Sequence, residues 1–157
     1  MTKELAGKVA IVTGAGRNIG RAIALALAEG GASVVVNARS NRPEADAVAR
    51  EIETAGGKAL VHIGDVADAV AVLAMADVTV KQFGRLDILV NNAALRREKP
   101  FAEMSYAAWR EILDVTLDGA FHCAKPACRR CASPARERSS ISAASAPIRG
   151  RRTGPMW

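Results

Sequence analysis

Short apolar runs alternate with longer amphipathic segments through most of the chain. Four runs rich in β-branched residues predict buried parallel strands, because they contain few polar positions. Four longer segments repeat apolar residues at helical spacing. The expected strands cover residues 8–14, 32–38, 58–65 and 86–93, and the expected helices cover residues 19–31, 42–57, 68–84 and 105–125.

Turn and capping residues mark the ends of the expected helices. Pro43 stands near the start of the second helix, and pairs of glycines end the first two helices. Ser105 is placed to cap the fourth helix. The first helix is expected to bury an apolar face made of Ile19, Ile23, Ala26 and Leu27.

The regular alternation of strand and helix predicts an α/β fold. Strands that are joined through helices run parallel, with right-handed crossovers and helices on both faces of the sheet. We predict a truncated Rossmann-type parallel sheet over residues 1–125, with strand order 3-2-1-4, and an irregular basic tail over residues 126–157. The fourth strand is then a free edge, which predicts marginal stability and aggregation or oligomer formation.

A glycine-rich turn, TGAGRNIG at residues 13–20, joins the first strand to the first helix. Glycines in such a turn let backbone N–H groups approach a pyrophosphate at the positive end of the helix. Tight turns that bind nothing also contain glycine, but a strand before the turn and a helix after it favour a dinucleotide site. The candidate binding residues of the turn are Gly14, Gly16, Arg17, Asn18, Ile19 and Gly20.

The end of the second strand bears on the choice of cofactor. A carboxylate about 20 residues after the turn usually binds the ribose 2′-OH of NAD, but this chain has Asn37 and then Arg39 there. Arg39, beside Ser40, can pair with a 2′-phosphate, and Arg17 supplies a second cation. The pattern favours NADP over NAD; the alternative is that Arg39 is a solvated loop charge.

Three motifs together resemble the short-chain dehydrogenase/reductase family, especially its 3-oxoacyl-acyl-carrier-protein-reductase-like members. VTGAGRNIG (12–20) is similar to the family's TGxxxGxG turn, with Asn18 in place of the middle glycine. GDV (64–66) resembles the family's adenine contact, and LDILVNNAA (86–94) resembles its NNAG motif. Each motif alone could be ordinary turn chemistry, but their order and spacing make the resemblance specific.

The resemblance implies an NADP-dependent oxidoreductase that transfers hydride between the cofactor and a small ketone or secondary alcohol. It implies that Asp65 bonds the exocyclic amine of adenine and that Val66 lies against the adenine ring. It also implies that Asn92 and Ala93 border the ribose on the nicotinamide side.

The family's catalytic residues do not occur in this sequence. The resemblance implies catalysis by a serine and a Tyr-x-x-x-Lys pair. The only tyrosine, Tyr106, is followed four residues later by Arg110, and Thr116 stands where the family has an asparagine. We therefore expect no catalytic residue and little or no turnover. The alternative is a non-catalytic nucleotide-binding or interaction protein with a basic tail.

Charge is distributed unevenly along the chain. Residues 1–125 contain 15 basic and 15 acidic residues, whereas residues 126–157 contain seven arginines and one acid, so the tail carries the whole net charge of +6. Without a basic face on a folded element, this pattern argues against a nucleic-acid partner. Arg, Ala, Ser and Pro supply 22 residues of the tail. This bias predicts an out-of-frame translation of GC-rich DNA, the alternative being a disordered extension.

The remaining patterns exclude further classes. No apolar run reaches the roughly 18 residues that cross a bilayer, and no signal sequence is recognisable, so we expect a cytoplasmic protein without membrane contact. Cys123, Cys128 and Cys131 have the opening spacing of an iron–sulfur site. The fourth cysteine is missing, and the spacing is interpreted as coincidence, with no metal site.

Overall fold

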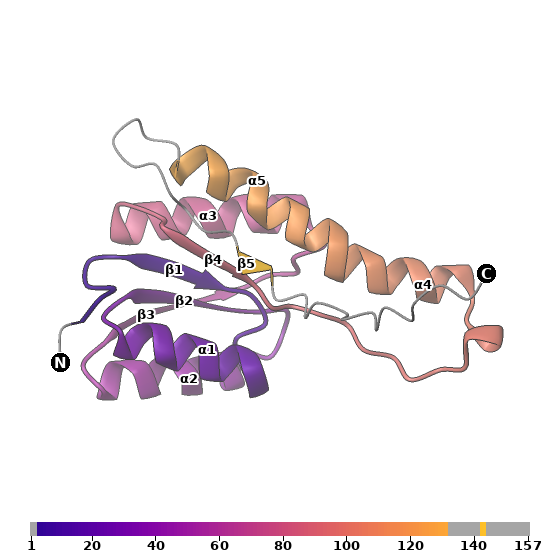
Figure 1. The fold of residues 1–157 in the computed structure, drawn as a ribbon, viewed down its shortest axis with the longest axis horizontal. Helices are drawn as coiled ribbons and strands as arrows, with labels where there is room; N and C mark the ends of the chain where they lie inside the picture. Colours follow the sequence, from indigo (N-terminus) through magenta and orange to yellow (C-terminus); the bar gives the residue numbers. More distant parts are fainter. Residues whose placement is uncertain (1–2, 132–141, 144–157) are drawn as a thin grey trace, which may run out of the picture.

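A single parallel sheet with helices on both faces forms the core of the computed structural model, in which residues 3–131 and 142–143 are described (Figure 1). This arrangement confirms the predicted α/β class. The strands are β1 (Val9–Val12), β2 (Ser33–Ala38), β3 (Lys58–Ile63), β4 (Ile88–Asn91) and β5 (Ser142–Ala143). The helices are α1 (Asn18–Glu29), α2 (Arg42–Thr54), α3 (Ala69–Phe83), η1 (Phe101–Glu103), α4 (Tyr106–Leu113), η2 (Asp114–Asp118) and α5 (Gly119–Cys131).

The strands are ordered β3-β2-β1-β4-β5, and every neighbouring pair is parallel. The order of the first four strands confirms the predicted 3-2-1-4 arrangement. β5 adds two residues that were not expected to form a strand, pairing with β4 at Val90 and Asn91. The free edge of β4 is therefore shorter than expected, and self-association stays a prediction.

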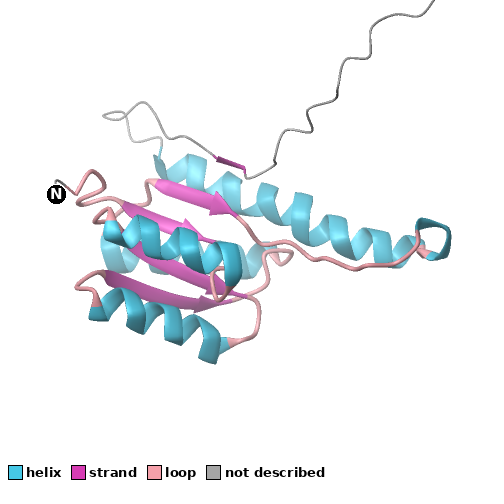
Figure 2. Ribbon diagram, turned by 60° about the horizontal axis from the view of Figure 1, so that its bottom comes forward, coloured by secondary structure: helices cyan, strands magenta, loops and turns pink. Residues whose placement is uncertain are grey.

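Alternate strand residues enter two separate cores, one on each face of the sheet. Val12, Val34 and Val36 pack with α1 and α2. Ile11 and Val35 point to the opposite face and pack with α3 and α5. Figures 1 and 2 show the two layers of helices on either side of the strands. Both faces are covered, which explains why the strand sequences are apolar throughout.

The buried face of α1 differs from the prediction. Its buried residues are Gly20, Ala24 and Ala28. The expected face is wrong at Ile19, which is 66% exposed, and at Ala26, which is also exposed. Small residues let the helix axis approach the sheet closely, so the larger side chains are displaced to the flanks of the helix.

The fourth predicted helix continues beyond its expected end. α4, η2 and α5 follow one another without a break, and η2 is a π-helical segment. The predicted stop at Pro126 is wrong, because Pro126 lies inside α5. Cys123 and Ala127 are buried in the core on the α3 side, and this burial offsets the backbone hydrogen bond that proline cannot donate.

Most of the predicted irregular tail lies outside the described residues, and the predicted frameshift lies there with it. Among the residues that the structure describes, no helix is both long and apolar enough to span a bilayer.

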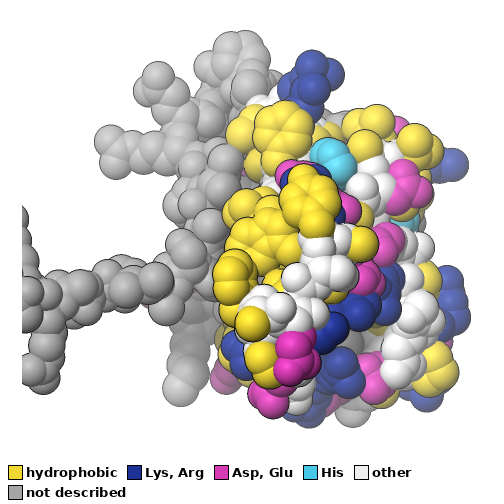
Figure 3. All heavy atoms as spheres, turned by 90° about the vertical axis from the view of Figure 1, so that its right-hand side faces the viewer, with side chains coloured by type: hydrophobic (Ala, Val, Ile, Leu, Met, Phe, Trp, Pro, Cys, Tyr) yellow, Lys and Arg dark blue, Asp and Glu magenta, His cyan; other side chains and the backbone are white. Residues whose placement is uncertain are grey.

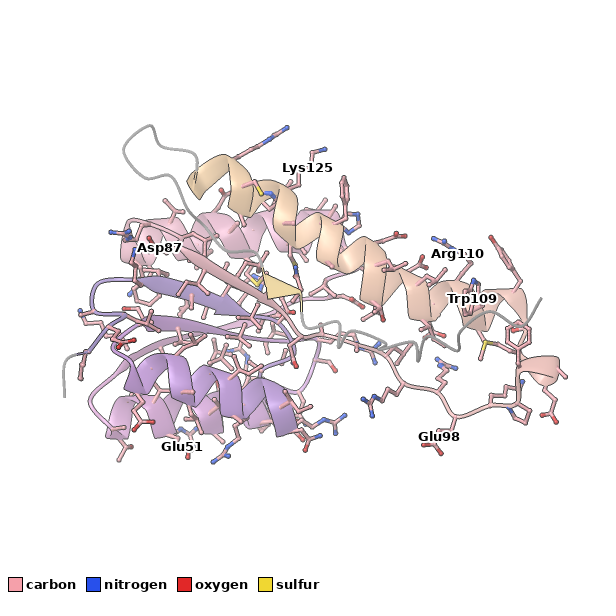
Figure 4. All side chains as sticks on the ribbon, viewed as in Figure 1. Glu51, Asp87, Glu98, Trp109, Arg110 and Lys125 are labelled. Atoms are coloured by element: carbon pink, nitrogen blue, oxygen red, sulfur yellow. The ribbon has the colours of Figure 1, made fainter. Side chains whose placement is uncertain are left out.

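α4 projects beyond the sheet (Figure 1), and it carries exposed aromatic side chains. Figure 3 shows hydrophobic side chains gathered on the face at this end of the molecule. Tyr106 and Trp109 of α4 are 76% and 43% exposed, and nearby Phe101 is 82% exposed. Trp109 and Arg110 lie far along this projecting helix in Figure 4. Exposed aromatic side chains thus lie close together on η1 and α4.

Candidate functional site

The carboxyl ends of the parallel strands border a cleft of about 600 Å³. This is where ligands bind in open parallel sheets. The cleft brings together every predicted binding residue: Gly14, Gly16, Arg17, Asn18, Ile19, Gly20, Arg39, Ser40, Asp65, Val66, Asn92 and Ala93. These residues come from four separate parts of the chain, and the fold alone makes them neighbours.

The glycine turn has the backbone conformation that its sequence suggests. Gly14 has φ +63°, and Asn18 has φ +49°. Asparagine tolerates the left-handed region better than other side chains, which explains how Asn18 can replace a glycine. Gly20 is needed for packing: a Cβ there would overlap the carbonyl oxygen of Gly14 and lie 2.5 Å from Nδ2 of Asn92.

The N-terminus of α1 opens into the cleft without a side-chain cap. Arg17 occupies the cap position and makes no side-chain cap hydrogen bond. By contrast, Asn41 caps α2 and Asp68 caps α3, each by accepting a backbone N–H. Ser105 caps α4 as predicted, at 3.2 Å from the Ala108 nitrogen. The free N–H groups and the helix dipole make the start of α1 suited to an anion.

Thr13 and Asn92 fasten the glycine turn to the end of β4. The buried hydroxyl of Thr13 accepts the backbone N–H groups of Asn92 and Ala93, each at 3.0 Å. Nδ2 of Asn92 donates to the carbonyl oxygens of Thr13 (2.9 Å) and Gly14 (3.1 Å). Asn92 therefore shapes the turn as well as lining the cleft. The role of Thr13 was not predicted, since its partners lie about 80 positions away.

Asn37 links the ends of three strands and was also missed as a functional residue. Its side chain is almost fully buried, at 2% exposure. Its Oδ1 accepts the N–H of Gly14 at 3.4 Å. Its Nδ2 donates to the carbonyl oxygens of His62 (3.3 Å) and Gly64 (3.1 Å). One amide thus holds the glycine turn at a fixed distance from the segment that contains Asp65.

The segment after β3 forms the far wall of the cleft. Oδ1 of Asp65 accepts the N–H of Ala67 at 2.9 Å. Val66 is 5% exposed and packs against α5. A Cβ on Gly119 would lie 2.6 Å from Cγ2 of Val66, so the absence of a side chain lets α5 approach this wall. The ring Nδ1 of His122 lies 3.2 Å from the Val66 carbonyl oxygen.

Two charged residues of the cleft were not predicted. Glu44, from the first turn of α2, and Arg96, from the loop after β4, line the cleft together with Arg17, Arg39 and Asp65. Neither belongs to a local motif, so the sequence offered no signal for them. Burial, together with the charge of Arg42, lowers the pKa of His62 on β3 and so favours its uncharged imidazole.

Among the described residues, the most extensively paired carboxylate is that of Asp87, at the opposite end of the sheet (Figure 4). Asp87 accepts the N–H of Val9 at 3.0 Å and the Nε of Arg85 at 2.6 Å. Burial acts to raise the pKa of Asp87, but these hydrogen bonds and the charges of Arg85 and Lys8 outweigh it and lower the pKa. This cluster stabilises the start of β1 and β4 and takes no part in the cleft.

The residues compared with the family's catalytic positions do not meet in the cleft. Thr116 is exposed on the π-helical segment η2 and is not a lining residue. Tyr106 lies on the projecting α4. Arg110 pairs with Asp114 (2.6 Å) and Asp118 (3.1 Å) on the same helical surface. Within residues 3–131 and 142–143, no group of histidine, cysteine and acidic side chains is arranged to hold a metal ion.

Comparison with known proteins adds an independent finding. The sequence model of the short chain dehydrogenase family matches residues 8–144. An uncharacterised oxidoreductase of Methylorubrum extorquens is 47% identical over 116 residues, covering 74% of this chain and 47% of the relative. The 3-oxoacyl-[acyl-carrier-protein] reductase FabG of Staphylococcus aureus is 44% identical over 120 residues, covering 76% of this chain and 49% of the relative.

Solved structures agree with this match. A dehydrogenase/reductase from Sinorhizobium meliloti superposes with a TM-score of 0.80 at 40% identity, covering 82% of this chain and 51% of its own. A short chain dehydrogenase from Burkholderia cenocepacia, solved in complex with NADP, superposes with a TM-score of 0.78 at 37% identity, covering 81% and 52%. The chain spans about half the length of these relatives.

Proposed function

Because the chain belongs to the short-chain dehydrogenase family, we propose that its cleft binds a nicotinamide dinucleotide and prefers NADP(H) to NAD(H). One observation carries this proposal: the uncapped N-terminus of α1 opens into the same cleft as Arg17 and Arg39. The helix terminus suits a pyrophosphate, and guanidinium groups suit a 2′-phosphate. The NADP complex of the Burkholderia relative supports the same choice.

The described residues fit such a cofactor. The left-handed turn residues and the missing side chain at Gly20 bring backbone N–H groups to the cleft, where the pyrophosphate would bind. We assign the adenine to Asp65 and Val66, and the nicotinamide ribose to Asn92 and Ala93. When bound, the nicotinamide supplies or accepts a hydride. The residues that line the cleft bind and orient the dinucleotide.

The activity that we propose for the family scaffold is hydride transfer to or from a ketone or secondary alcohol. For this chain alone, we propose binding with little or no turnover. These 157 residues contain no Tyr-x-x-x-Lys pair to supply the acid and base. Thr116 is exposed and lies outside the cleft lining, which supports the same expectation.

Calorimetric titration of NADPH and NADH into the 157-residue chain tests the binding proposal. We expect tighter binding of NADPH. Arg39→Ser should weaken NADPH binding by about tenfold or more, because it removes a charge-assisted hydrogen bond, and should leave NADH binding nearly unchanged. Arg50→Ser, at an exposed position of α2 outside the cleft, is the matched charge control. Equal affinities for the two cofactors would contradict the preference.

Turnover is tested separately by following NADPH oxidation with a 3-oxoacyl thioester, chosen because the Staphylococcus relative is named a 3-oxoacyl-[acyl-carrier-protein] reductase. We expect no oxidation above the rate without enzyme. Sustained carbonyl-dependent oxidation by the purified chain would refute the proposed lack of turnover while leaving the binding proposal intact.

A further inference from the structure

Glu44 places a carboxylate against the middle of the glycine turn. A Cβ on Gly16 would lie 3.4 Å from the Cβ of Glu44 and 3.7 Å from its Oε2. Glu44 is half-buried and lines the cleft with Arg17 and Arg39. Its backbone N–H donates to Oδ1 of Asn41 at 3.3 Å. The cap therefore fixes the backbone of Glu44, and its side chain extends along the wall of the cleft.

The carboxylate of Glu44 differs from two other acids of α2 in having no basic partner. Asp46 pairs with Arg42 at 3.9 Å, and Glu51 pairs with Arg21 at 2.6 Å. Among the described residues, Glu44 forms no salt bridge and no side-chain hydrogen bond. Its negative charge is thus not neutralised by a neighbour and acts on whatever occupies the cleft.

The adenosine ribose is the part of a dinucleotide that this charge would meet. In this fold the ribose lies beside the glycine turn and the end of β2, where Ser40, Asn41 and Glu44 line the cleft. A carboxylate accepts a hydrogen bond from a ribose 2′-OH but repels a 2′-phosphate, which carries up to two negative charges. Arg17 and Arg39 line the same cleft, and their positive charges attract a 2′-phosphate.

We propose that Glu44 is a specificity-determining residue that favours the unphosphorylated ribose and limits the preference of the site for NADP(H). This inference rests on the proposed dinucleotide function. The acid that is usually found at the end of β2 is absent, and Glu44 supplies its charge from the first turn of α2 instead. The two arginines and Glu44 together set the ratio of the two affinities.

A purely structural role predicts a different result. An acid in the first turn of a helix stabilises the helix through its dipole, and this contribution does not depend on which nucleotide is bound. If Glu44 served only this purpose, its replacement would lower the melting temperature slightly and change both affinities by the same factor. The ratio of the two dissociation constants therefore separates the two roles.

The experiment compares dissociation constants for NADPH and NADH in the wild type, Glu44→Gln and Glu53→Gln. Glu53 is an exposed acid of the same helix that does not line the cleft, so its variant removes the same charge. We expect Glu44→Gln to raise the preference for NADPH by about three- to tenfold, as a solvated charge pair over a short distance predicts. The ratio for Glu53→Gln should equal that of the wild type.

An unchanged ratio in Glu44→Gln, or an equal shift in Glu53→Gln, would overturn the inference. The shift should also shrink at high salt, because it is electrostatic. Failure of the proposed function appears differently: the wild type would then bind neither nucleotide. Thermal unfolding of each variant checks that it is folded, and Glu44→Ala repeats the test if Glu44→Gln is not.

Discussion

Replacing Asn37 tests how the ends of three neighbouring strands are held together. The side chain is 2% exposed. Its amide uses one acceptor for Gly14 and two donors for His62 and Gly64, at 3.4, 3.3 and 3.1 Å. The variant Asn37→Asp has almost the same shape but, when ionised, donates no hydrogen bond. The carboxylate would face two carbonyl oxygens in a buried position.

The loss of unfolding free energy in Asn37→Asp follows from these contacts. Losing two hydrogen bonds removes about 1 kcal/mol each. Burial beside carbonyl oxygens raises the pKa of the introduced carboxyl above its unfolded value of about 3.9. A rise of about two units adds ~2.7 kcal/mol when the group must ionise. We therefore expect Asn37→Asp to lower the free energy of unfolding by about 4–5 kcal/mol at pH 8.

The sign of the pH dependence is fixed by the direction of this shift. A carboxyl with a raised folded-state pKa binds more protons when folded, so stability falls as pH rises from about 4 to about 6. The penalty should therefore be smaller at pH 5, where a protonated carboxyl donates one hydrogen bond. Asn37→Leu introduces no titratable group, so the free energy of unfolding that it removes should not change with pH.

Urea unfolding between pH 5 and pH 8, followed by circular dichroism, measures these differences. Asn41→Asp is the matched control, because it makes the same chemical change at an exposed helix cap where aspartate serves as well as asparagine. If Asn37→Asp and Asn41→Asp showed equal stability and the same pH profile, the amide of Asn37 would not be the link between the three strand ends.

Two further outcomes are expected from packing and exposure. Gly20→Ala should destabilise the protein by about 1–3 kcal/mol or more and abolish NADPH binding. The new Cβ would lie 2.9 Å from Cα of Ala15 and would overlap the Gly14 carbonyl oxygen. Ala26→Ser, at an exposed position of the same helix, should change neither the denaturant midpoint nor the affinity measured by NADPH titration. Cys128 is exposed, whereas burial raises the pKa of Cys123 to about 12. A thiol reagent at pH 8 should therefore modify Cys128 and spare Cys123, which peptide mass spectrometry measures. Rapid modification of Cys123 in the folded protein would contradict its buried position.

The sequence by itself determined the strand and helix order. Strands buried on both faces need continuous apolar runs, and helices need apolar residues at helical spacing, so both signals are local. The glycine turn was recognisable for the same reason, since a strand, a turn and a helix start occupy consecutive residues. The resemblance to the family then indicated Asp65 and Asn92, because their motifs are also short and continuous.

Only the tertiary structure decided which distant residues became neighbours. Asn37 meets Gly14 and Gly64 because β1, β2 and β3 are paired in a fixed register. The sequence of one strand does not indicate which residues of other strands its side chains will contact. Pro126 stays helical because Cys123 and Ala127 are buried against α3, whereas local propensity predicts a stop. Glu44 reaches Gly16 because α2 packs beside α1, and helix packing is set by long-range contacts that no periodicity encodes.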